Sequence, residues 1–459
     1  MTATATEGFS APKSKPLLLI TAFPGEGHTN PLINIASYLV KNGYEVVFMA
    51  PEPFRGKIEA TGAEYLPIDN PLNREVFQAF RDAALLPKGP ERVAAQYVAV
   101  FFVLQPARTQ NTENALAMLR ARDPDRDIIF MEDVFNSSFW AFRHGRPLPA
   151  GFTTLPKAIG FGVAPLLIES QDNAPMSLGL LPDSTESGRK RNKIIHELVE
   201  KGPMKILIDE WHDAMRRCGC TDIPSGPFFK ACYAAHDAVL QLCSPSLEYQ
   251  LSDLPSKIEF VGVLPRKVIK PDFQYPTWWP AVERTQEQNY RHVVFVSQGT
   301  LNPDYSELIY PALKAFADRD DILVVITLGV HDAKLPTDVD IPPNARVIDY
   351  MPYDAILKHT DVFVSNAGYG TYTHAVSNGV PVLLAGENEE KIEVTMRAVY
   401  AGVGLSLETQ TPTSEQVRKG VEQILQDNKY KKAAMKLKME NDGMNALANI
   451  EAKIRQLSQ

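Results

Sequence analysis

The sequence predicts an α/β protein with two similar halves, each a parallel β-sheet covered by helices. The 459 residues exceed what one hydrophobic core usually supports, so two domains are expected. In each half, short apolar runs alternate with segments whose apolar residues recur at helical spacing, which is typical of parallel sheets with helices on both faces. A proline-rich stretch over residues 265–280 separates the halves and is typical of a linker.

The first half opens with an expected strand at 16–21. Asn30 can cap the following helix, and Pro31 suits its first position because proline lacks the N–H that is unpaired there. Further strands are expected at 44–49, 63–68 and 127–131. Two long stretches without clear periodicity, 70–110 and 164–225, interrupt the alternation, and such insertions usually carry function.

The second half repeats the alternation. A helix is expected around 305–316, and the tail at 414–457 has a charged, helical pattern. Strands are expected at 293–297, 322–328, 346–349, 362–364 and 380–384. Because ligands of open α/β sheets bind at the carboxyl ends of strands, a cleft between the halves is the expected site.

The most informative motif is the turn at residues 366–371, Asn-Ala-Gly-Tyr-Gly-Thr, which joins an apolar strand to a helix. A helix N-terminus presents unpaired N–H groups and the positive end of a dipole, so it can bind a diphosphate without a metal. A glycine turn alone is common in any βαβ connection. Two more loops of small residues follow strands, however, at 297–300 and at 24–28 (Pro-Gly-Glu-Gly-His). The sequence therefore predicts a protein that handles a nucleotide diphosphate.

Composition excludes several classes of protein. The net charge of −8 argues against nucleic acid as a partner, and the one basic run, 189–193, is expected to be a solvated helix face. No segment approaches the roughly 18 apolar residues of a membrane span, and the N-terminus lacks a signal-peptide core. The four cysteines do not fit zinc-site spacing, so reduced thiols in a cytoplasmic protein are expected: Cys218, Cys220, Cys232 and Cys243.

Together the loops at 24–28, 296–300, 366–370 and 390–394 resemble those of the UDP-dependent glycosyltransferases, notably the microbial, fungal-type enzymes that act on small lipophilic acceptors. The resemblance covers nearly the whole chain. It implies the GT-B fold, in which two Rossmann-like domains face each other across a cleft. The implied division is an acceptor-binding domain at 1–264, the linker at 265–290, a nucleotide-sugar-binding domain at 291–440, and a C-terminal helix at 441–459 that packs back toward the first domain.

The resemblance also implies a donor site. Tyr350 matches the aromatic residue that stacks on uracil, although an ordinary packed aromatic remains an alternative. The backbone near Met351 is expected to read the base edge, and Ser297 and Thr300 to lie near the phosphates or ribose. The residues expected to hold the diphosphate are Asn366, Gly368, Gly370 and Thr371.

Glu390 and Lys391 match the pair that grips the sugar hydroxyls in the family. The better-known members carry Asp-Gln there, so the identity of the donor sugar stays open. They also carry His in place of Asn366 and Glu in place of His374; a neutral amide can still donate to phosphate.

His28 matches the histidine that removes the proton from the acceptor hydroxyl. An imidazole with a pKa near 6.5 can act as a base at neutral pH. Asp133 matches its partner carboxylate, which orients the ring and stabilises the imidazolium. Neighbouring Glu132 is the competitor, and one of the two carboxylates is expected to be only solvated.

The implied reaction is an in-line attack on a UDP-sugar, by default UDP-glucose, with inversion to a β-glycoside and without a cofactor or metal. The acceptor is a small lipophilic molecule, a phenol such as a flavonoid, with a sterol or macrolide as alternatives. Residues that could line its pocket are Glu26, Phe101, Phe102, Trp140, Phe161 and Met176. Each of the apolar ones could equally be core. A monomer is expected.

Two other classes of protein compete with this interpretation. A dinucleotide-dependent oxidoreductase requires Gly-x-Gly-x-x-Gly after the first strand, and the loop at 24–28 lacks that spacing. A non-catalytic nucleotide-binding subunit of the same fold would normally have lost the base or its partner, and both His28 and Asp133 are present.

Overall fold

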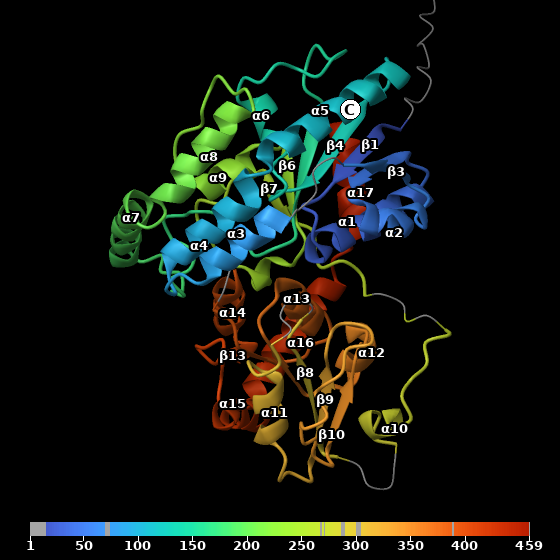
Figure 1. Ribbon diagram of the computed structural model, residues 1–459, viewed down its shortest axis with the longest axis vertical. Coiled ribbons are helices and arrows are strands. Elements are labelled where there is room, and N and C mark those ends of the chain that lie inside the picture. The colour runs from blue at the N-terminus through green and yellow to red at the C-terminus, as the bar shows by residue number, and fades with distance from the viewer. Residues whose placement is uncertain are drawn as a thin grey trace, which may run out of the picture.

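The computed structural model describes residues 15–68, 74–266, 269, 271–285, 290–299, 304–387 and 390–458. Figure 1 shows two lobes, each a β-sheet with helices on both faces, joined by the segment that carries α10 (Trp279–Val282). The predicted α/β class with two parallel sheets is confirmed.

The N-terminal lobe contains a seven-stranded sheet in the order β3-β2-β1-β4-β5-β6-β7, and every pair in it is parallel. Its strands are β1 (Leu17–Thr21), β2 (Val46–Ala50), β3 (Glu64–Pro67), β4 (Ile128–Asp133), β5 (Lys157–Gly162), β6 (Ala238–Gln241) and β7 (Ile258–Phe260). Its helices are α1 (Glu26–Lys41), α2 (Arg55–Glu59), α3 (Arg74–Ala84), α4 (Pro90–Tyr97), α5 (Gln105–Arg122), α6 (Trp140–Arg143), α7 (Glu186–Lys201), α8 (Lys205–Arg217) and α9 (Phe228–Ala234), with a π-helical turn at Val98–Phe102.

The C-terminal lobe contains a six-stranded parallel sheet in the order β10-β9-β8-β11-β12-β13. Its strands are β8 (His292–Ser297), β9 (Ile322–Thr327), β10 (Ala345–Ile348), β11 (Val362–Ser365), β12 (Val382–Leu384) and β13 (Gly404–Ser406). The chain after the linker also forms α11 (Ile309–Ala315), α12 (Tyr353–Ile356), α13 (Tyr369–Ser377), α14 (Lys391–Tyr400), α15 (Ser414–Gln426), α16 (Asn428–Asp442) and α17 (Ala446–Leu457).

Two expectations about the N-terminal lobe are wrong. Helix α1 begins at Glu26, with Gly25 as its N-cap, so Asn30 does not cap it and Pro31 lies inside the helix. His28 therefore lies in the first helical turn, where its N–H bonds to the carbonyl of Gly25. The long stretches at 70–110 and 164–225 are also not wholly irregular, because the first contains α3 and α4 and the second contains α7 and α8.

The chain crosses between the lobes a second time near its end. After α16 on the C-terminal lobe, α17 packs on the N-terminal lobe beside α1 (red in Figure 1). Ala446, Ile450 and Ile454 are fully buried in the same core cluster as the strand residues of β1 and β2. Glu451, also on α17, accepts hydrogen bonds from Tyr38 and Tyr44.

Candidate active site

In both sheets the candidate residues lie where the strand order reverses. In the N-terminal sheet, β1 and β4 are neighbours, and the chain leaves β1 in one direction and β4 in the other. In the C-terminal sheet, β8 and β11 are the two neighbouring strands at which the order reverses. Ligands of open α/β sheets bind at such switch points, because the loops that follow the two strands diverge there.

The N-terminal switch point brings His28 and Asp133 together. The imidazole Nδ1 lies 2.6 Å from Asp133 Oδ2. Asp133 is fully buried, and its other oxygen accepts the N–H of Phe135. Because Nδ1 donates to the carboxylate, the neutral ring keeps a lone pair on Nε2. His28 is 27% exposed, so a substrate can reach it.

The surroundings of His28 set its basicity. Burial works to lower the pKa of the imidazole, but attraction to Asp133, their hydrogen bond and the charge of Glu390 outweigh it. The pKa of His28 is therefore raised above 6.5. Glu390 belongs to the C-terminal lobe, so the candidate sugar-binding segment lies within electrostatic reach of the candidate base.

Glu132 is not the solvated carboxylate that the sequence suggested. It is fully buried, and its oxygens accept hydrogen bonds from Ser138, Phe139, Asn136 and His236. These bonds fix the turn that follows β4. Glu132 therefore holds the backbone beside Asp133 while Asp133 holds His28.

The C-terminal switch point holds the turn between β11 and α13. Asn366 is almost buried and donates its amide to the carbonyl of Gln298, and Ala367 adopts a positive φ of 64°. Gly368 is the N-cap of α13. A Cβ added at Gly370 would meet no atom within 4 Å, so the space in front of this backbone is open. An anion can approach the helix N-terminus there.

A tyrosine that the sequence did not single out joins the strand-end loops. The Tyr353 hydroxyl lies 2.7 Å from Ser297 Oγ and is also hydrogen-bonded to Thr371. Burial raises the pKa of this phenol. The spacing of Tyr353 from Tyr350 gives no signal in the sequence, because the contact depends on how the loop after β10 folds over β8. Thr300 lies outside the described residues.

The other donor-site candidates follow β10 or begin α14. The Tyr350 ring is 41% exposed and packs on His331 with ring centroids 4.4 Å apart, so it can receive a flat base on its open face. Met351 is buried, and its N–H bonds to Thr327. Glu390 is the N-cap of α14, and Lys391 is its first residue. His374 is paired with Asp354 at 3.1 Å.

Of the acceptor candidates, Phe101 lies at the site. Its ring packs against Phe23 and Phe135, and both of these rings contact the His28 imidazole. Glu26 lies on the exposed side of the same helical turn and pairs with Lys57.

The predicted pocket roles of three other aromatic residues are not supported. Phe102, Trp140 and Phe161 are at most 2% exposed. Trp140 packs on Trp211 and Phe228, and Phe161 lies in the core together with the residues of β1 and α1. Neighbouring core side chains enclose these three residues, so little of their surface is open to a ligand.

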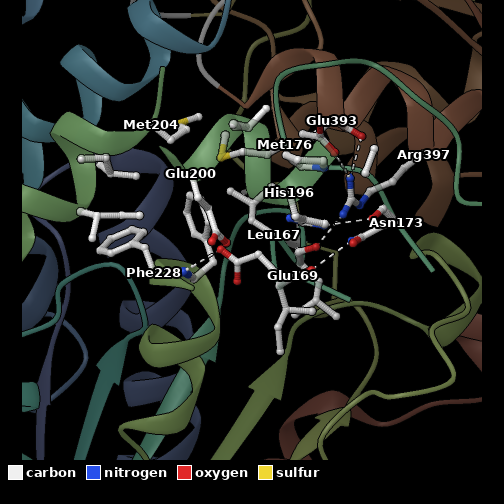
Figure 2. Close-up of a pocket in the computed structure, with 18 residues that line it drawn as sticks. Leu167, Glu169, Asn173, Met176, His196, Glu200, Met204, Phe228, Glu393 and Arg397 are labelled. Atoms are coloured by element: carbon white, nitrogen blue, oxygen red, sulfur yellow. Dashed lines mark hydrogen bonds and ion pairs between the residues drawn. The ribbon is translucent and has the colours of Figure 1, made fainter. Parts of the chain in front are cut away.

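Met176 lines a cavity of about 40 Å³ between the loop after β5, helices α7–α9 and helix α14. Figure 2 shows Glu393 and Arg397 of α14 on one side of this cavity and Met204 and Phe228 on the other. Phe229, which also lines it, packs on Phe135 next to His28. The cavity therefore extends from the aromatic wall of the candidate base toward the C-terminal lobe.

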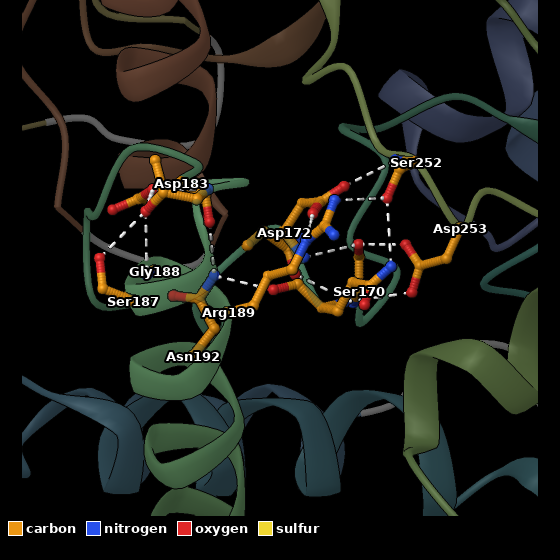
Figure 3. Close-up of polar contacts among 12 residues, drawn as sticks. Ser170, Asp172, Asp183, Ser187, Gly188, Arg189, Asn192, Ser252 and Asp253 are labelled. Atoms are coloured by element: carbon orange, nitrogen blue, oxygen red, sulfur yellow. Dashed lines mark hydrogen bonds and ion pairs between the residues drawn. The ribbon is translucent and has the colours of Figure 1, made fainter.

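Polar contacts fix the outer end of the loop after β5. In Figure 3, Asp172 faces Arg189 of α7 and Ser252, and Ser170 faces Asp253. Burial works to raise the pKa of Asp172, but the hydrogen bonds from Ser252 and the pairing with Arg189 lower it overall. The loop is thus anchored on the N-terminal lobe.

The described part of the chain contains no helix long and apolar enough to cross a bilayer. Within the same residues, His, Cys, Asp and Glu side chains do not gather in groups of three or more that could hold a metal ion. The four cysteines are buried free thiols.

Known proteins are similar to this chain in sequence and in fold. A family model described as "Erythromycin biosynthesis protein CIII-like, C-terminal domain" matches residues 312–457. The chain is 35% identical to UDP-glucosyltransferase 1 of Beauveria bassiana (strain ARSEF 2860), covering 95% of this chain and 94% of that protein. It is 32% identical to UDP-glucosyltransferase A1 of Starmerella bombicola, covering 97% and 93%.

The crystal structure of the glycosyltransferase of kitacinnamycin superposes with a TM-score of 0.66 and 17% identity, covering 97% of this chain and 100% of that chain. The spinosyn rhamnosyltransferase SpnG, complexed with thymidine diphosphate, superposes with a TM-score of 0.63 and 18% identity, covering 96% and 100%. These likenesses confirm the predicted GT-B fold.

Proposed function

Because the chain belongs to the UDP-glycosyltransferase family and is an enzyme that moves a sugar from a UDP-sugar to a small-molecule acceptor, we propose that it is an inverting glucosyltransferase that acts on phenols such as flavonoids. One observation carries the proposal. A buried carboxylate binds Nδ1 of a partly exposed histidine, and Glu390 of the other lobe lies within electrostatic reach of that imidazole.

In this proposal His28 is the general base. Its Nε2 takes the proton of the acceptor hydroxyl as the oxygen attacks the anomeric carbon. Asp133 keeps the ring in the tautomer that leaves Nε2 free and stabilises the imidazolium that forms. The bond from the sugar to the β-phosphate oxygen breaks on the opposite face, so an α-linked donor gives a β-glycoside.

The leaving diphosphate is stabilised by the N-terminus of α13. The open space at Gly370 admits its oxygens, and Thr371 and the amide of Asn366 lie at the same turn. Fixed backbone dipoles aimed at a developing charge can replace a metal ion in this role. Uracil stacks on the exposed face of Tyr350, and Glu390 and Lys391 receive the sugar hydroxyls.

The walls around His28 favour a planar acceptor. Phe23 and Phe135 contact the imidazole and Phe101 packs against both, and these flat rings suit an aromatic acceptor better than a puckered one. A sterol or macrolide is the second candidate, because the same apolar rings can also pack against an aliphatic skeleton.

The test is a transfer assay with UDP-glucose and a panel of flavonoids, simple phenols, a sterol and a macrolide, each with and without EDTA. Glycoside formed from the phenols, with β configuration by NMR and with an unchanged rate in EDTA, supports the proposal. A rate that is lost in EDTA and restored by a divalent cation contradicts the metal-free site. Transfer only to the sterol or macrolide contradicts the phenol assignment.

A further inference from the structure

One buried cluster of polar side chains joins the two lobes beside the candidate site. Its centre is Arg397 of α14, which is 1% exposed and pairs through Nε with Glu248, also 1% exposed, on the N-terminal lobe. A second nitrogen of the guanidinium donates to the carbonyl of Leu166 at 2.6 Å. The guanidinium also lies over the ring of Tyr249, 4.3 Å from its centroid.

Glu248 in turn contacts both the acceptor side and the donor side. One of its oxygens accepts the N–H of Leu166 at 3.1 Å and the hydroxyl of Tyr369 at 3.3 Å. Tyr369 is the first residue of α13, so it belongs to the diphosphate turn. Leu166 belongs to the loop after β5, residues 163–179, which we call the acceptor loop.

The far end of the acceptor loop is held by the same helix. Glu393 pairs with Arg397 at 3.0 Å and accepts the N–H of Ser177 at 3.0 Å. Ser177 has a φ of 75°, a conformation that a residue other than glycine adopts only when its surroundings impose it. Two positions on, a Cβ at Gly179 would lie 2.7 Å from Ile392, so the loop backbone lies directly against α14.

Helix α14 begins at Lys391, directly after Glu390. These are the two residues assigned to the donor sugar. The cluster therefore contacts the acceptor loop at Leu166 and Ser177, the sugar-binding segment through α14, and the diphosphate turn through Tyr369. Burying an ion pair is costly unless its hydrogen bonds are satisfied, and a paired, hydrogen-bonded charge can set the register between two packed surfaces.

We propose that Arg397 and Glu248 are positioning residues that hold the acceptor loop against the sugar-binding segment, so that the sugar passes to the acceptor rather than to water. This inference rests on the proposed function. In the competing reaction, a water oxygen bonds to the anomeric carbon, the bond to the β-phosphate oxygen breaks, and the water proton goes to the base. Free glucose and UDP result. A loosely held acceptor loop leaves room for that water and places the acceptor poorly.

The experiment measures glycoside formed for each UDP released, with UDP-glucose and the best phenol from the panel. Arg397→Lys keeps a charge but cannot make the forked contacts, because an ammonium is a single point of donation. The double variant Arg397→Met with Glu248→Gln removes both charges of the central pair, so Glu248 is not left as a buried carboxylate without its partner if the single variant fails to fold, and Glu393 keeps the N–H of Ser177. We expect the ratio of glycoside formed to UDP released to fall by about tenfold in the double variant and by less in Arg397→Lys. The affinity for UDP, measured by calorimetry, is expected to stay at the wild-type value in both variants.

The matched control is Glu440→Gln on α16. Glu440 also joins the lobes through a carboxylate, which accepts the N–H of Ser246, a residue outside the acceptor loop and α14. Its ratio is expected to stay at the wild-type value.

A wild-type ratio in folded Arg397→Lys and in the folded double variant overturns the inference. Equal losses of UDP affinity, UDP release and glycoside also overturn it, because they indicate a merely structural role. If the proposed function is wrong, the result is different, because the wild-type enzyme itself then forms no phenol glucoside.

Discussion

Asp133 binds His28 through Nδ1, although the two residues are 105 positions apart in the chain. Both residues were predicted from the resemblance to the glycosyltransferases, and each lies at or shortly after the end of an apolar run that becomes a strand of the same sheet. The part played by Glu132 was not predicted, because the sequence does not reveal that Ser138, Phe139 and His236 converge on it. At this scale the sequence gives the chemical groups, whereas the packing decides which carboxylate contacts which partner.

His28→Ala is expected to reduce transfer to phenols by about 10²–10⁴-fold, because a general base contributes about that much. UDP affinity, measured by calorimetry, is expected to stay near the wild-type value, since the diphosphate turn lies on the other lobe. His144→Ala, which changes a histidine of the same lobe outside the site, is the control. A variant that keeps its turnover contradicts the role of His28, and one that loses UDP affinity contradicts the assignment of this loop to the acceptor side.

The pH dependence of kcat/KM reports the ionisation of His28. A base must be unprotonated, so the rate rises with pH through the pKa of the imidazole, which is expected above 6.5. Asp133→Asn removes the attraction that raises this pKa while the burial that lowers it remains, so the rise moves to lower pH and its plateau falls. Glu390→Gln is expected to move the rise in the same direction by less.

The control for this profile is Asp123→Asn, a surface carboxylate of the N-terminal lobe. Its profile is expected to match that of the wild-type enzyme. An unmoved profile in Glu390→Gln contradicts the approach of the two lobes in solution.

At the scale of elements, the strands were predicted well and the helix starts less well. Strands such as β8 and β9 consist mostly of consecutive apolar residues, so their burial on both faces can be predicted from the sequence. The start of α1 was misplaced because Asn30-Pro31 is a strong signal, yet the chain already turns at Gly25. Helix α7 could have been found from its cap, since Thr185 accepts the N–H of Gly188. The contact of Glu248 with Arg397, 149 positions apart, has no local signal.

Gly370→Ala tests the turn before α13. The added methyl group meets no protein atom within 4 Å and improves helix propensity by up to about 1 kcal/mol, so thermal stability is expected to be kept or raised. The same methyl group projects into the space proposed for the diphosphate, so UDP affinity is expected to fall by about tenfold, or about 1.4 kcal/mol. Thermal melting and calorimetry measure the two effects.

Gly56→Ala on α2 is the matched control, because a Cβ there also meets nothing within 4 Å. It is expected to leave UDP affinity unchanged. Unchanged affinity in Gly370→Ala contradicts the placement of the diphosphate at this turn.

At the scale of the whole molecule, both sheets place their candidate residues at the reversal of strand order. This could not be read from the sequence, because the positions of β4 and β11 beside β1 and β8 depend on crossovers between distant segments. The cleft was expected from the general rule for such sheets. The buried cluster around Arg397, which joins the two lobes, was not expected.

Ile450→Ala on α17 is expected to destabilise the N-terminal lobe by about 2–5 kcal/mol, because a fully buried side chain of that lobe's core is removed. Hydrogen exchange is expected to increase in β1 and β2 and to change little in β8 and β9. Met439→Ala on α16, where the side chain is 64% exposed, is the control. Faster exchange confined to the C-terminal lobe contradicts the packing of α17.

The return of α17 also bears on how hybrid enzymes of this architecture can be built. A chimera that exchanges donor specificity by joining two parents at the linker imports a last helix shaped for a foreign surface, and Glu451 then faces tyrosines that its new host does not supply. A second junction between α16 and α17 returns that helix to its native neighbours. Expression yields of one-junction and two-junction hybrids offer a direct comparison.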